Sequence, residues 1–476
     1  MPLVGRRHEQ EQLETCLWSG RPEFIAVYGR RRVGKTYLVR EFFKNRFAFY
    51  ATGTARKKTR DQLRAFHEAL RSAGDTTRAM PGDWFEAFSR LRALLEGEGV
   101  AREPGSGRRV VFLDELPWMD TPRSDFRAAF DYFWNSWASA QDDLLMIACG
   151  SATSWMIDNL IEDHGGFYNR VTRQIHLEPF SLLETQELLD MQKLGYTQAQ
   201  VLEAYMVFGG IPFYLNLLDR KYSLAQNVDL LCFSRDGQLC NEFERLFASL
   251  FRRSERHVAI VRALAQTNRG MLRTELSARP EIGDGEPLTK ALKELEQCGF
   301  IRGYQSYVTK VKGRVFQLVD PFSRFYLRFL DGMDGHGLTS WTDFHRTPAY
   351  FAWRGLAFEN VCLLHARQIK IVLGISGVSS AEYAWHSRSA NPGAQIDLLI
   401  DRADGVVNVC EVKFTDGELA IDASMAEDLR RRLDVFQAEV KPRKALHLTI
   451  ISVSGVARNA YYDTVQRVIT ADDLFT

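Results

Sequence analysis

The chain has 476 residues, of which 45% are hydrophobic and 25% charged, and this composition is typical of soluble globular proteins with about two to four domains. Its net charge is +1, so any nucleic-acid-binding or membrane-binding surface must be local. The seven cysteines are scattered without C-x-x-C spacing, which argues against a zinc site and indicates reduced thiols. No signal peptide opens the chain and no apolar run reaches the roughly 18 residues of a membrane helix, so we expect a cytoplasmic protein without a membrane partner.

The first predicted elements are an amphipathic helix from His8 to Trp18 and a strand from Phe24 to Tyr28. A glycine-rich loop and a helical segment follow this strand, and the spacing of the loop matches G-x-x-x-x-G-K-T, a phosphate-binding loop. The loop residues, which we expect to bind ATP, are Gly29, Arg30, Arg31, Arg32, Val33, Gly34, Lys35 and Thr36. Backbone N–H groups would converge on the phosphates, the lysine would reach the β- and γ-phosphates, and the threonine hydroxyl would bind Mg²⁺.

A second strand, Val110 to Leu113, ends in two carboxylates, Asp114 and Glu115. This pattern is expected of a Walker B strand beside the phosphate loop in a parallel sheet. Asp114 would hold Mg²⁺ through water and Glu115 would polarise the attacking water. An Asp-Glu pair after an apolar run can also be a solvated strand end, but the upstream loop favours the catalytic interpretation.

Aromatic residues recur at helical spacing after this strand, from Phe126 to Trp137. They could stack nucleic-acid bases, but a packed helix face explains them better. The next apolar strand, Leu144 to Cys149, is followed by Gly150 and Ser151.

The segment Val4-Gly5-Arg6 and the phosphate loop together resemble the prokaryotic ATPases related to the AAA+ and signal-transducing NTPases. The resemblance implies that this Gly-Arg segment packs near the adenine and that Ser151 senses the γ-phosphate. It also implies that Arg170, or as second choice Arg173, meets the γ-phosphate, either in cis or from a neighbouring subunit. The plainer alternatives are a helix N-terminus without ligand contact, a turn serine and a surface arginine.

Residues 182–218 are predicted to form a helical lid. Within them, Phe208-Gly209-Gly210-Ile211-Pro212 resembles the Gly-x-Pro signature of the signal-transducing NTPases, which would couple the lid to the nucleotide. Gly-Gly before proline can also be simply a helix break.

Residues 251–316 contain 13 lysines and arginines against 7 aspartates and glutamates, a local excess of positive charge. The pattern suits a winged helix-turn-helix. Its predicted helices are 258–264, 272–276 and 288–298, and its predicted strands are 304–308 and 315–319. If DNA binds, the side chains facing it would be Lys290, Lys293, Lys310, Lys312 and Arg314. Contact with another protein is the alternative.

The last region contains Glu359, Asp397, Glu411 and Lys413 in the order of a PD-(D/E)XK nuclease. Residues two apart on a strand share a face, so Glu411 and Lys413 would point together while Cys410 points to the core. Asp397 and Glu411 would bind Mg²⁺, Glu359 would support the metal or its water, and Lys413 would orient the attacking water or stabilise charge on phosphorus. This region also resembles the family's C-terminal domain of unknown function, which is related to restriction-endonuclease folds.

The sequence therefore predicts an α/β protein: a P-loop NTPase parallel sheet with a helical lid, then a winged helix, then an α/β restriction-endonuclease-like domain. The predicted boundaries are residues 1–180, 181–245, 246–335 and 340–476. We expect a Mg²⁺-dependent ATPase coupled to a DNA-directed module with an endonuclease centre. The alternatives are an ATP-switched regulatory or scaffold protein with an inactive nuclease-like domain, and a phosphoryl-transfer enzyme acting on a small molecule. ATP, Mg²⁺ and DNA are the expected ligands, and a second copy or another protein partner is left open.

Overall fold

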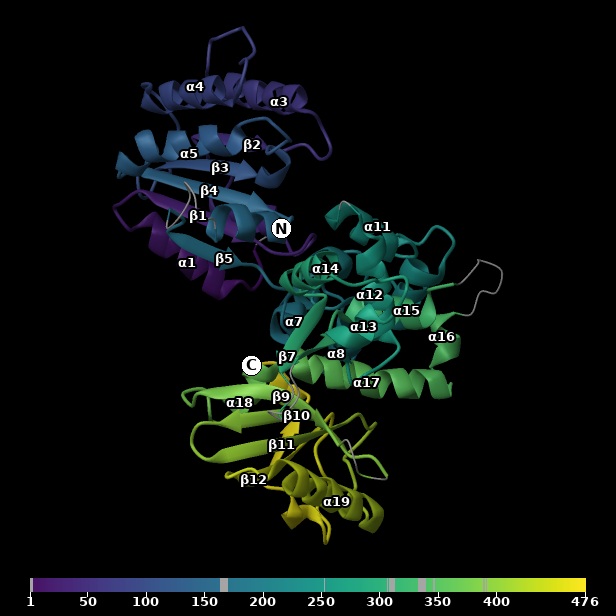
Figure 1. Cartoon of the computed structure of the whole chain (residues 1–476). Helices are drawn as coiled ribbons and strands as arrows, with labels where there is room; N and C mark the ends of the chain where they lie inside the picture. Colours follow the sequence, from purple (N-terminus) through teal and green to yellow (C-terminus); the bar gives the residue numbers. More distant parts are fainter. Residues whose placement is uncertain are drawn as a thin grey trace. The chain divides into compact units, whose positions relative to one another are not determined.

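The computed structural model describes residues 3–162, 170–251, 253–305, 307, 313–332, 340–345, 347–387, 390 and 392–476. The chain divides into two compact units, Met1–Pro179 and Phe180–Thr476 (Figure 1). Among the described residues, every helix is too short or too polar to cross a lipid bilayer. The two Lys residues predicted for the wing, Lys310 and Lys312, and the segment before Arg170 lie outside the described residues.

Unit 1 is built on a parallel sheet of five strands in the order β2-β3-β4-β1-β5. The strands are β1 (Glu23–Tyr28), β2 (Phe49–Thr52), β3 (Arg109–Asp114), β4 (Leu144–Gly150) and β5 (Arg173–His176). β1, β3 and β4 are buried along almost their whole length, as expected of a parallel sheet covered on both faces.

The strand order places one strand between the two strands that carry the predicted ATP site. The strand that ends at Asp114 does not lie next to the strand that leads into the phosphate loop, because β4 pairs with both β1 and β3 and lies between them. Strand order is set by the crossover connections, which the local sequence pattern does not reveal. All five strands still end at one edge of the sheet, so the residues after β1, β3 and β4 come close together.

Helices cover both faces of this sheet (Figure 1). They are α1 (Arg7–Leu17), α2 (Lys35–Phe42), α3 (Thr59–Ser72), α4 (Trp84–Glu96), α5 (Phe126–Ser136) and α6 (Thr153–Met156), with the short helical segments η1 (Leu116–Trp118), η2 (Ala138–Ala140) and η3 (Ile157–Ile161). The rings of Phe126, Phe130 and Phe133 on α5 are buried in one core with Trp84 and Phe88 of α4. The aromatic stripe is therefore a packed helix face and offers no base-stacking surface.

Unit 2 begins with helices α7 (Leu182–Met191), α8 (Gln198–Phe208), α9 (Pro212–Leu215), α10 (Leu224–Val228), η4 (Asp229–Phe233) and α11 (Glu242–Leu250). At the glycine pair between α8 and α9, the backbone passes very close to the backbone of Phe180. The Phe180 amide donates to the Gly210 carbonyl at 2.6 Å, and a Cβ on Gly210 would lie 1.9 Å from the Phe180 carbonyl oxygen. Only glycine fits at this crossing.

The next part of unit 2 has the helices α12 (Glu255–Ala265), α13 (Arg273–Ser277) and α14 (Glu286–Gln297) and the strands β6 (Met271–Leu272), β7 (Ile301–Gln305) and β8 (Arg314–Leu318). The strands form an antiparallel sheet in the order β6-β8-β7. The three helices predicted from the pattern of apolar residues are confirmed to within a few residues.

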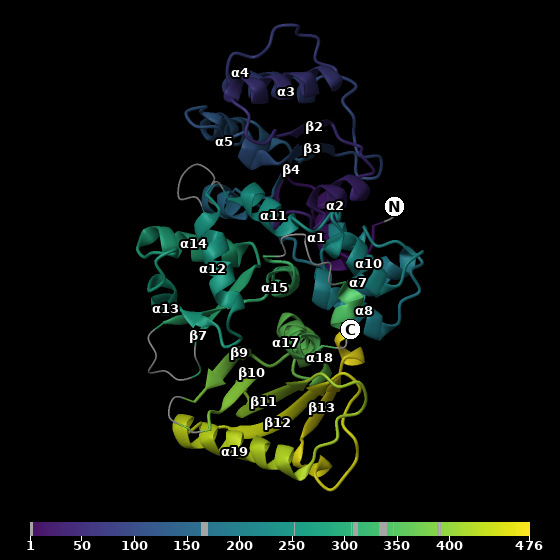
Figure 2. The same ribbon diagram turned by 90° about the vertical axis from the view of Figure 1, so that its right-hand side faces the viewer.

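The remaining elements of unit 2 are α15 (Pro321–Phe329), α16 (Trp341–Phe344), α17 (Pro348–Leu364), α18 (Ala366–Val372), β9 (Ser380–His386), β10 (Gln395–Arg402), β11 (Val406–Lys413), α19 (Ala423–Val440), β12 (Ala445–Ser452), η5 (Tyr462–Thr464), β13 (Arg467–Thr470) and η6 (Asp472–Leu474). The second large sheet has the order β13-β12-β11-β10-β9, in which β9 to β11 are antiparallel and β11 to β13 parallel. Helices α17 and α19 lie on opposite faces of it (Figure 2).

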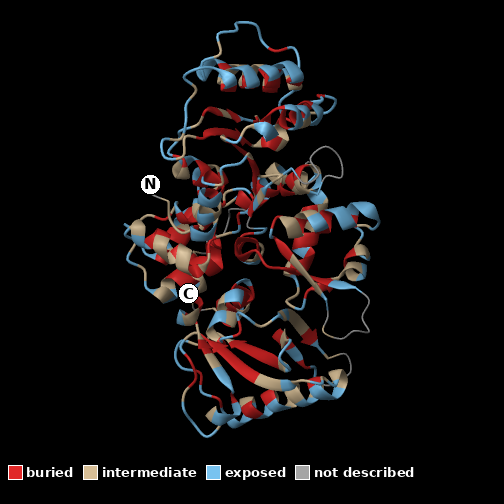
Figure 3. Ribbon diagram, turned by 90° about the vertical axis from the view of Figure 1, so that its left-hand side faces the viewer, coloured by how far each residue is buried: buried red, intermediate tan, exposed pale blue. Residues whose placement is uncertain are grey.

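Burial is continuous along the central strands of this sheet (Figure 3). Val407 and Val409 of β11 pack with Phe436 of α19, while Cys410 on the other face of the strand is also fully buried. Glu411 therefore belongs to a strand that is buried on both faces and is itself only 4% exposed. The predicted core position of Cys410 is confirmed, and Glu411, on the opposite face of the strand, is buried as well.

Candidate functional site

The phosphate loop joins β1 to α2, and its backbone takes positive φ angles at Gly29 (144°), Arg32 (74°) and Gly34 (94°). A side chain at Gly29 is excluded, because its Cβ would lie 2.3 Å from the Leu177 carbonyl oxygen. Lys35 is buried, and its ammonium donates to the carbonyls of Gly29 and Arg30 at 2.8 Å each. The loop thus wraps around its own lysine, in the arrangement in which a phosphate can be received by the backbone N–H groups and the ammonium.

Thr36 and Asp114, the two predicted Mg²⁺ ligands, are in direct contact. The Thr36 hydroxyl donates to Asp114 Oδ2 at 2.8 Å, although the residues are 78 positions apart. Asp114 is 4% exposed, and burial raises the pKa of its carboxyl, with a further contribution from the charge of Glu115. A hydroxyl and a carboxylate at one point beside a phosphate loop fit a Mg²⁺ ion that keeps several of its waters.

Glu115 and Ser151 meet at the ends of β3 and β4. The Ser151 hydroxyl donates to Glu115 Oε1 at 2.6 Å and its amide to Oε2 at 3.4 Å. Glu115 itself has a left-handed backbone with φ 48°, which turns the chain sharply after Asp114. Ser151, the predicted γ-phosphate sensor, thus orients Glu115, the predicted general base.

Two residues of this site were not predicted as such. Cys149, the penultimate residue of β4, is fully buried beside Asp114, and burial together with the charge of Asp114 raises the pKa of its thiol. His176 ends β5 and stacks on Tyr28, with ring centroids 5.0 Å apart. Both lie at the ends of strands, and that position was the only sequence signal available for them.

The N-terminal Gly-Arg segment is built into the phosphate loop. Arg6 is 3% exposed, has a left-handed backbone with φ 56°, and donates from Nη2 to the Val33 carbonyl at 3.0 Å. Arg6 therefore holds the middle of the loop.

Arg170 and Arg173 lie far from this loop in their own chain. β5 runs parallel to β1 with Arg173 opposite Ile25 and His176 opposite Tyr28. Arg173 is thus three strand residues, about 10 Å, before the edge that carries the loop, and its guanidinium lies by Cys16 of α1. Arg170 precedes β5 and is exposed. Both arginines therefore lie away from the loop end of β5, and contact of either with a γ-phosphate, in cis or from a neighbouring subunit, stays a prediction.

A family model described as an ATPase domain predominantly from Archaea matches residues 3–218. Residues 3–218 are thus similar to archaeal-type ATPase domains. An uncharacterized protein of Methanocaldococcus jannaschii, MJECL04, is 23% identical to the chain over 420 residues, which are 87% of this chain and 88% of that protein. An uncharacterized ATP-binding protein of the same archaeon, MJ0423, is 43% identical over 44 residues, 9% of this chain and 75% of that protein.

The Walker-type ATPase PABY2304 of Pyrococcus abyssi has a similar structure, with a TM-score of 0.50 at 20% identity, covering 68% of this chain and 96% of that chain. At this identity the likeness shows the fold alone. The assignment of residues 3–218 to an ATPase-type domain therefore depends on the family match and on the geometry of the phosphate loop.

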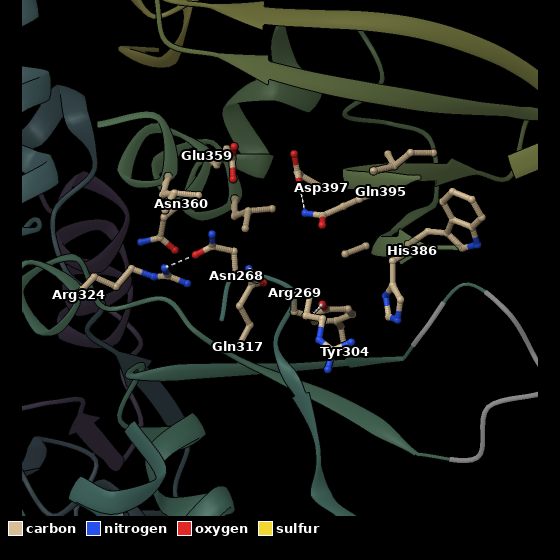
Figure 4. A pocket seen from close by; sticks show the side chains of 15 residues that line it. Asn268, Arg269, Tyr304, Gln317, Arg324, Glu359, Asn360, His386, Gln395 and Asp397 are labelled. Atoms are coloured by element: carbon tan, nitrogen blue, oxygen red, sulfur yellow. Dashed lines mark hydrogen bonds between the residues drawn. The ribbon is translucent and has the colours of Figure 1, made fainter. Parts of the chain in front are cut away.

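Beyond the ATPase domain, unit 2 brings together the four residues of the second predicted centre. Glu359 and Asp397 line one pocket (Figure 4). Burial raises the pKa of Glu359 to about 8. The charges of Asp397 and Glu411 raise it further, and those of Lys413 and Arg324 lower it. Lys413 Nζ lies 2.7 Å from Glu411 Oε1, so these two side chains share a face of β11 as predicted. The carboxylates from α17, β10 and β11 thus form one electrostatic cluster.

Arg432 of α19 is the residue that the sequence did not reveal. Its Nη1 donates to both oxygens of Glu411, at 3.0 and 3.1 Å, and its Nη2 lies 2.7 Å from Asp428. With Lys413 also on Oε1, the Glu411 carboxylate is fully engaged by cations. Within the described ranges no three His, Cys, Asp or Glu side chains are arranged to hold a metal ion. This arrangement does not fit a metal bound by Glu411.

The predicted DNA-facing residues give a mixed result. Lys290 and Lys293 are exposed on α14. Arg314 instead pairs with Glu296 and donates to the Gly303 carbonyl at 2.9 Å. Other arginines of residues 251–316 also have carboxylate partners, in the pairs Arg262–Asp331, Arg269–Glu275, Arg273–Asp284 and Arg279–Glu281. These arginines are therefore held in ion pairs, but all their partners except Asp331 are acids already counted within residues 251–316, so the local excess of positive charge remains.

Proposed function

We propose that the chain is a Mg²⁺-dependent ATPase whose reaction takes place between the phosphate loop and the ends of β3 and β4. The contact between the Thr36 hydroxyl and Asp114 Oδ2 carries this proposal, because it brings the two expected Mg²⁺ ligands to one point beside Lys35. Glu115 is the general base or water-polarising group, and Ser151 positions it through the 2.6 Å hydrogen bond. Mg²⁺, when bound, neutralises charge on the β- and γ-phosphates.

The test compares Lys35→Ala and Glu115→Gln with the wild type in two assays, release of phosphate from ATP and binding of a fluorescent ATP analogue. We expect Lys35→Ala to lose binding, because the ammonium that meets the phosphates is gone. Glu115→Gln should keep binding and lose about 100-fold or more of the turnover, the range of general-base loss. The matched control is Glu98→Gln, an exposed carboxylate of the same unit.

A wild-type turnover rate in Glu115→Gln would contradict the assignment of the base. Turnover of ATP without any added acceptor would count against the alternative of phosphoryl transfer to a small molecule.

We further propose that ATP hydrolysis controls a DNA-directed module in unit 2. Two observations support this part. The elements α12 to β8 have the order helix, strand, helix, helix, strand, strand of a winged helix. Glu359, Asp397, Glu411 and Lys413 come together in the order of a PD-(D/E)XK centre.

The state of that centre separates two candidate functions, DNA cleavage and DNA binding without cleavage. The full engagement of Glu411 by Arg432 and Lys413 favours binding without cleavage in this arrangement. Plasmid and oligonucleotide DNA would be incubated with Mg²⁺ or Mn²⁺, with and without ATP, using the wild type, Asp397→Ala and Lys35→Ala. Cleavage that is lost in Asp397→Ala would establish a nuclease, and its response to Lys35→Ala would show whether ATP controls it. Absence of cleavage with intact ATP turnover would leave the DNA-binding candidate.

A further inference from the structure

A short basic segment, residues 56–64, lies in unit 1 where the chain passes from β2 into α3 (Figure 1). Its five basic residues are all exposed, and they are Arg56, Lys57, Lys58, Arg60 and Arg64. The segment contains one acidic residue, Asp61, whereas the net charge of the whole chain is only +1. Within the part of the chain that the structure describes, no carboxylate forms an ion pair with Lys57, Lys58, Arg60 or Arg64. The basic segment is therefore a local surface of positive charge without compensating acids.

The basic segment is hydrogen-bonded to the end of β2 through Gln62, which is 2% exposed. Gln62 Oε1 accepts from the Thr54 amide at 2.9 Å, and its Nε2 donates to the Thr54 carbonyl at 2.6 Å. The Lys57 amide donates to the same carbonyl at 3.4 Å. Thr54 is thus held at both of its backbone groups by residues of the basic segment.

Gly53, the neighbour of Thr54, lies against the backbone of Glu115. The Gly53 amide donates to the Asp114 carbonyl at 2.9 Å, and a Cβ on Gly53 would lie 2.3 Å from the Glu115 carbonyl oxygen. A second connection joins the hydroxyls of Thr59 and Thr121, 2.6 Å apart, the latter in the loop after η1. A shift of the basic segment therefore acts on the backbone that aims the Glu115 carboxylate.

We propose that the basic segment binds the phosphate backbone of duplex DNA and that this contact raises the turnover of ATP through the backbone at Glu115. Cations without carboxylate partners suit a polyanion, because each cation that meets a phosphate releases a counterion from the duplex. Arg60 and Arg64 are neighbours on one face of α3, so both can meet the same stretch of DNA. The coupling rests on the proposed ATPase reaction with Glu115 as its base, whereas the DNA contact does not.

The first test measures binding of a fluorescein-labelled 20-base-pair DNA duplex to the full chain by fluorescence anisotropy. It uses EDTA, so that no cleavage can occur, and NaCl from 50 to 300 mM. Each phosphate contact contributes about 0.9 to the slope of log K against log [NaCl], so Lys57→Gln/Lys58→Gln should lower this slope by about 2. The same variant should keep the wild-type turnover of ATP in the absence of DNA.

The matched control is Lys44→Gln/Arg46→Gln. These two exposed basic residues precede β2, so they lie at the opposite edge of the sheet from the basic segment. This variant loses the same charge and should keep the wild-type salt slope.

The second test measures phosphate release from ATP with and without the duplex. We expect the duplex to raise the wild-type turnover about fivefold, which is the lower end of typical coupling between sites. Gln62→Ala keeps the basic residues and removes both hydrogen bonds to Thr54, so it should bind the duplex as the wild type does and lose this rise. If Gln62→Ala is unstable, Thr59→Val, which removes only the hydrogen bond to Thr121, should reduce the rise.

Equal salt slopes in Lys57→Gln/Lys58→Gln and the control variant would overturn the DNA contact. Binding of phosphatidylserine vesicles without binding of the duplex would overturn the choice of DNA as the polyanion. A wild-type turnover that saturating duplex leaves unchanged, or a full rise in both Gln62→Ala and Thr59→Val, would overturn the coupling. A wild type that hydrolyses no ATP at all would refute the ATPase proposal, while the salt slopes would still test the DNA contact.

Discussion

Protonation of His365 should weaken unit 2 as the pH falls below neutrality. This histidine follows α17 and is 2% exposed. Its Nδ1 donates to the Val361 carbonyl at 2.9 Å and its Nε2 accepts from the Leu182 amide at 3.0 Å, so the ring is held in the neutral form. Burial lowers the pKa of His365 from 6.5 to about 4.

The sign and size of the effect follow from proton linkage. Between pH 6.5 and about 4 the unfolded chain binds a proton at this residue and the folded chain does not, so stability falls as the pH falls through this window. At about 1.4 kcal/mol per pH unit, the loss between pH 7.5 and pH 5 is about 2 kcal/mol. Glu359 has the opposite effect on stability. Because its pKa in the folded chain is raised to about 8, its contribution to stability is lost as the pH rises and grows as the pH falls. The effect of His365 must therefore be read as a difference between variants.

Urea unfolding followed by circular dichroism at pH 7.5 and pH 5 would be compared for the wild type and His365→Gln. The glutamine oxygen can still accept from the Leu182 amide but does not titrate. We expect the wild type to lose about 2 kcal/mol more than His365→Gln over this interval. His8→Gln, at an exposed histidine of unit 1, should keep the wild-type pH dependence. The same pH dependence in wild type and His365→Gln would refute the reasoning.

Three further predictions concern single positions. Ser151→Ala should lower the turnover of ATP, measured as phosphate release, about tenfold and leave the affinity for ATP nearly unchanged. A change in affinity alone would argue against a positioning role for Ser151. Gly210→Ala places a Cβ 1.9 Å from the Phe180 carbonyl oxygen and should lower the free energy of unfolding by about 3 kcal/mol or more. Gly34→Ala meets no atom within 4 Å and should lower it by about 1 kcal/mol, because alanine is strained at φ 94°. Thermal unfolding compares the two variants, and equal losses of stability would contradict the steric argument for Gly210. Arg432→Gln should raise the affinity for Mn²⁺ about tenfold in calorimetric titration, and an unchanged affinity would show that Glu411 is not a ligand.

The phosphate-loop site could be predicted from sequence because each of its parts is a local pattern. The loop, the Asp-Glu pair and the serine each follow a buried strand directly, and parallel strands end at one edge of their sheet. The contact between Thr36 and Asp114 follows from that rule alone, even though β4 separates their strands.

What the sequence did not predict depends on packing between elements that are distant in the chain. The position of Arg170 follows from the register of β5 against β1, which pairs Arg173 with Ile25. The pair between Arg432 and Glu411 depends on which turn of α19 lies over β11, and a rotation of the helix by one residue would remove it. A local sequence pattern determines neither the register of a strand nor the rotation of a helix about its axis.

Glu411 links the two candidate functions of unit 2 through a single competition. Its side chain is 5% exposed, so neither its carboxylate nor the Arg432 guanidinium can lose the other without a large penalty, unless a new partner arrives. A divalent cation could compensate Glu411, and Arg432 would then keep Asp428 as its anionic partner but lose Glu411. A DNA phosphate could take the place of Glu411 on Arg432, so that the two ligands together would restore both lost contacts. Binding of the cation and of DNA should therefore be positively coupled, and by reciprocity the 20-base-pair duplex should raise the affinity for Mn²⁺ by the same factor as Mn²⁺ raises the affinity for the duplex. If the two affinities are independent, Arg432 is a fixed structural partner of Glu411, and unit 2 binds DNA without a metal.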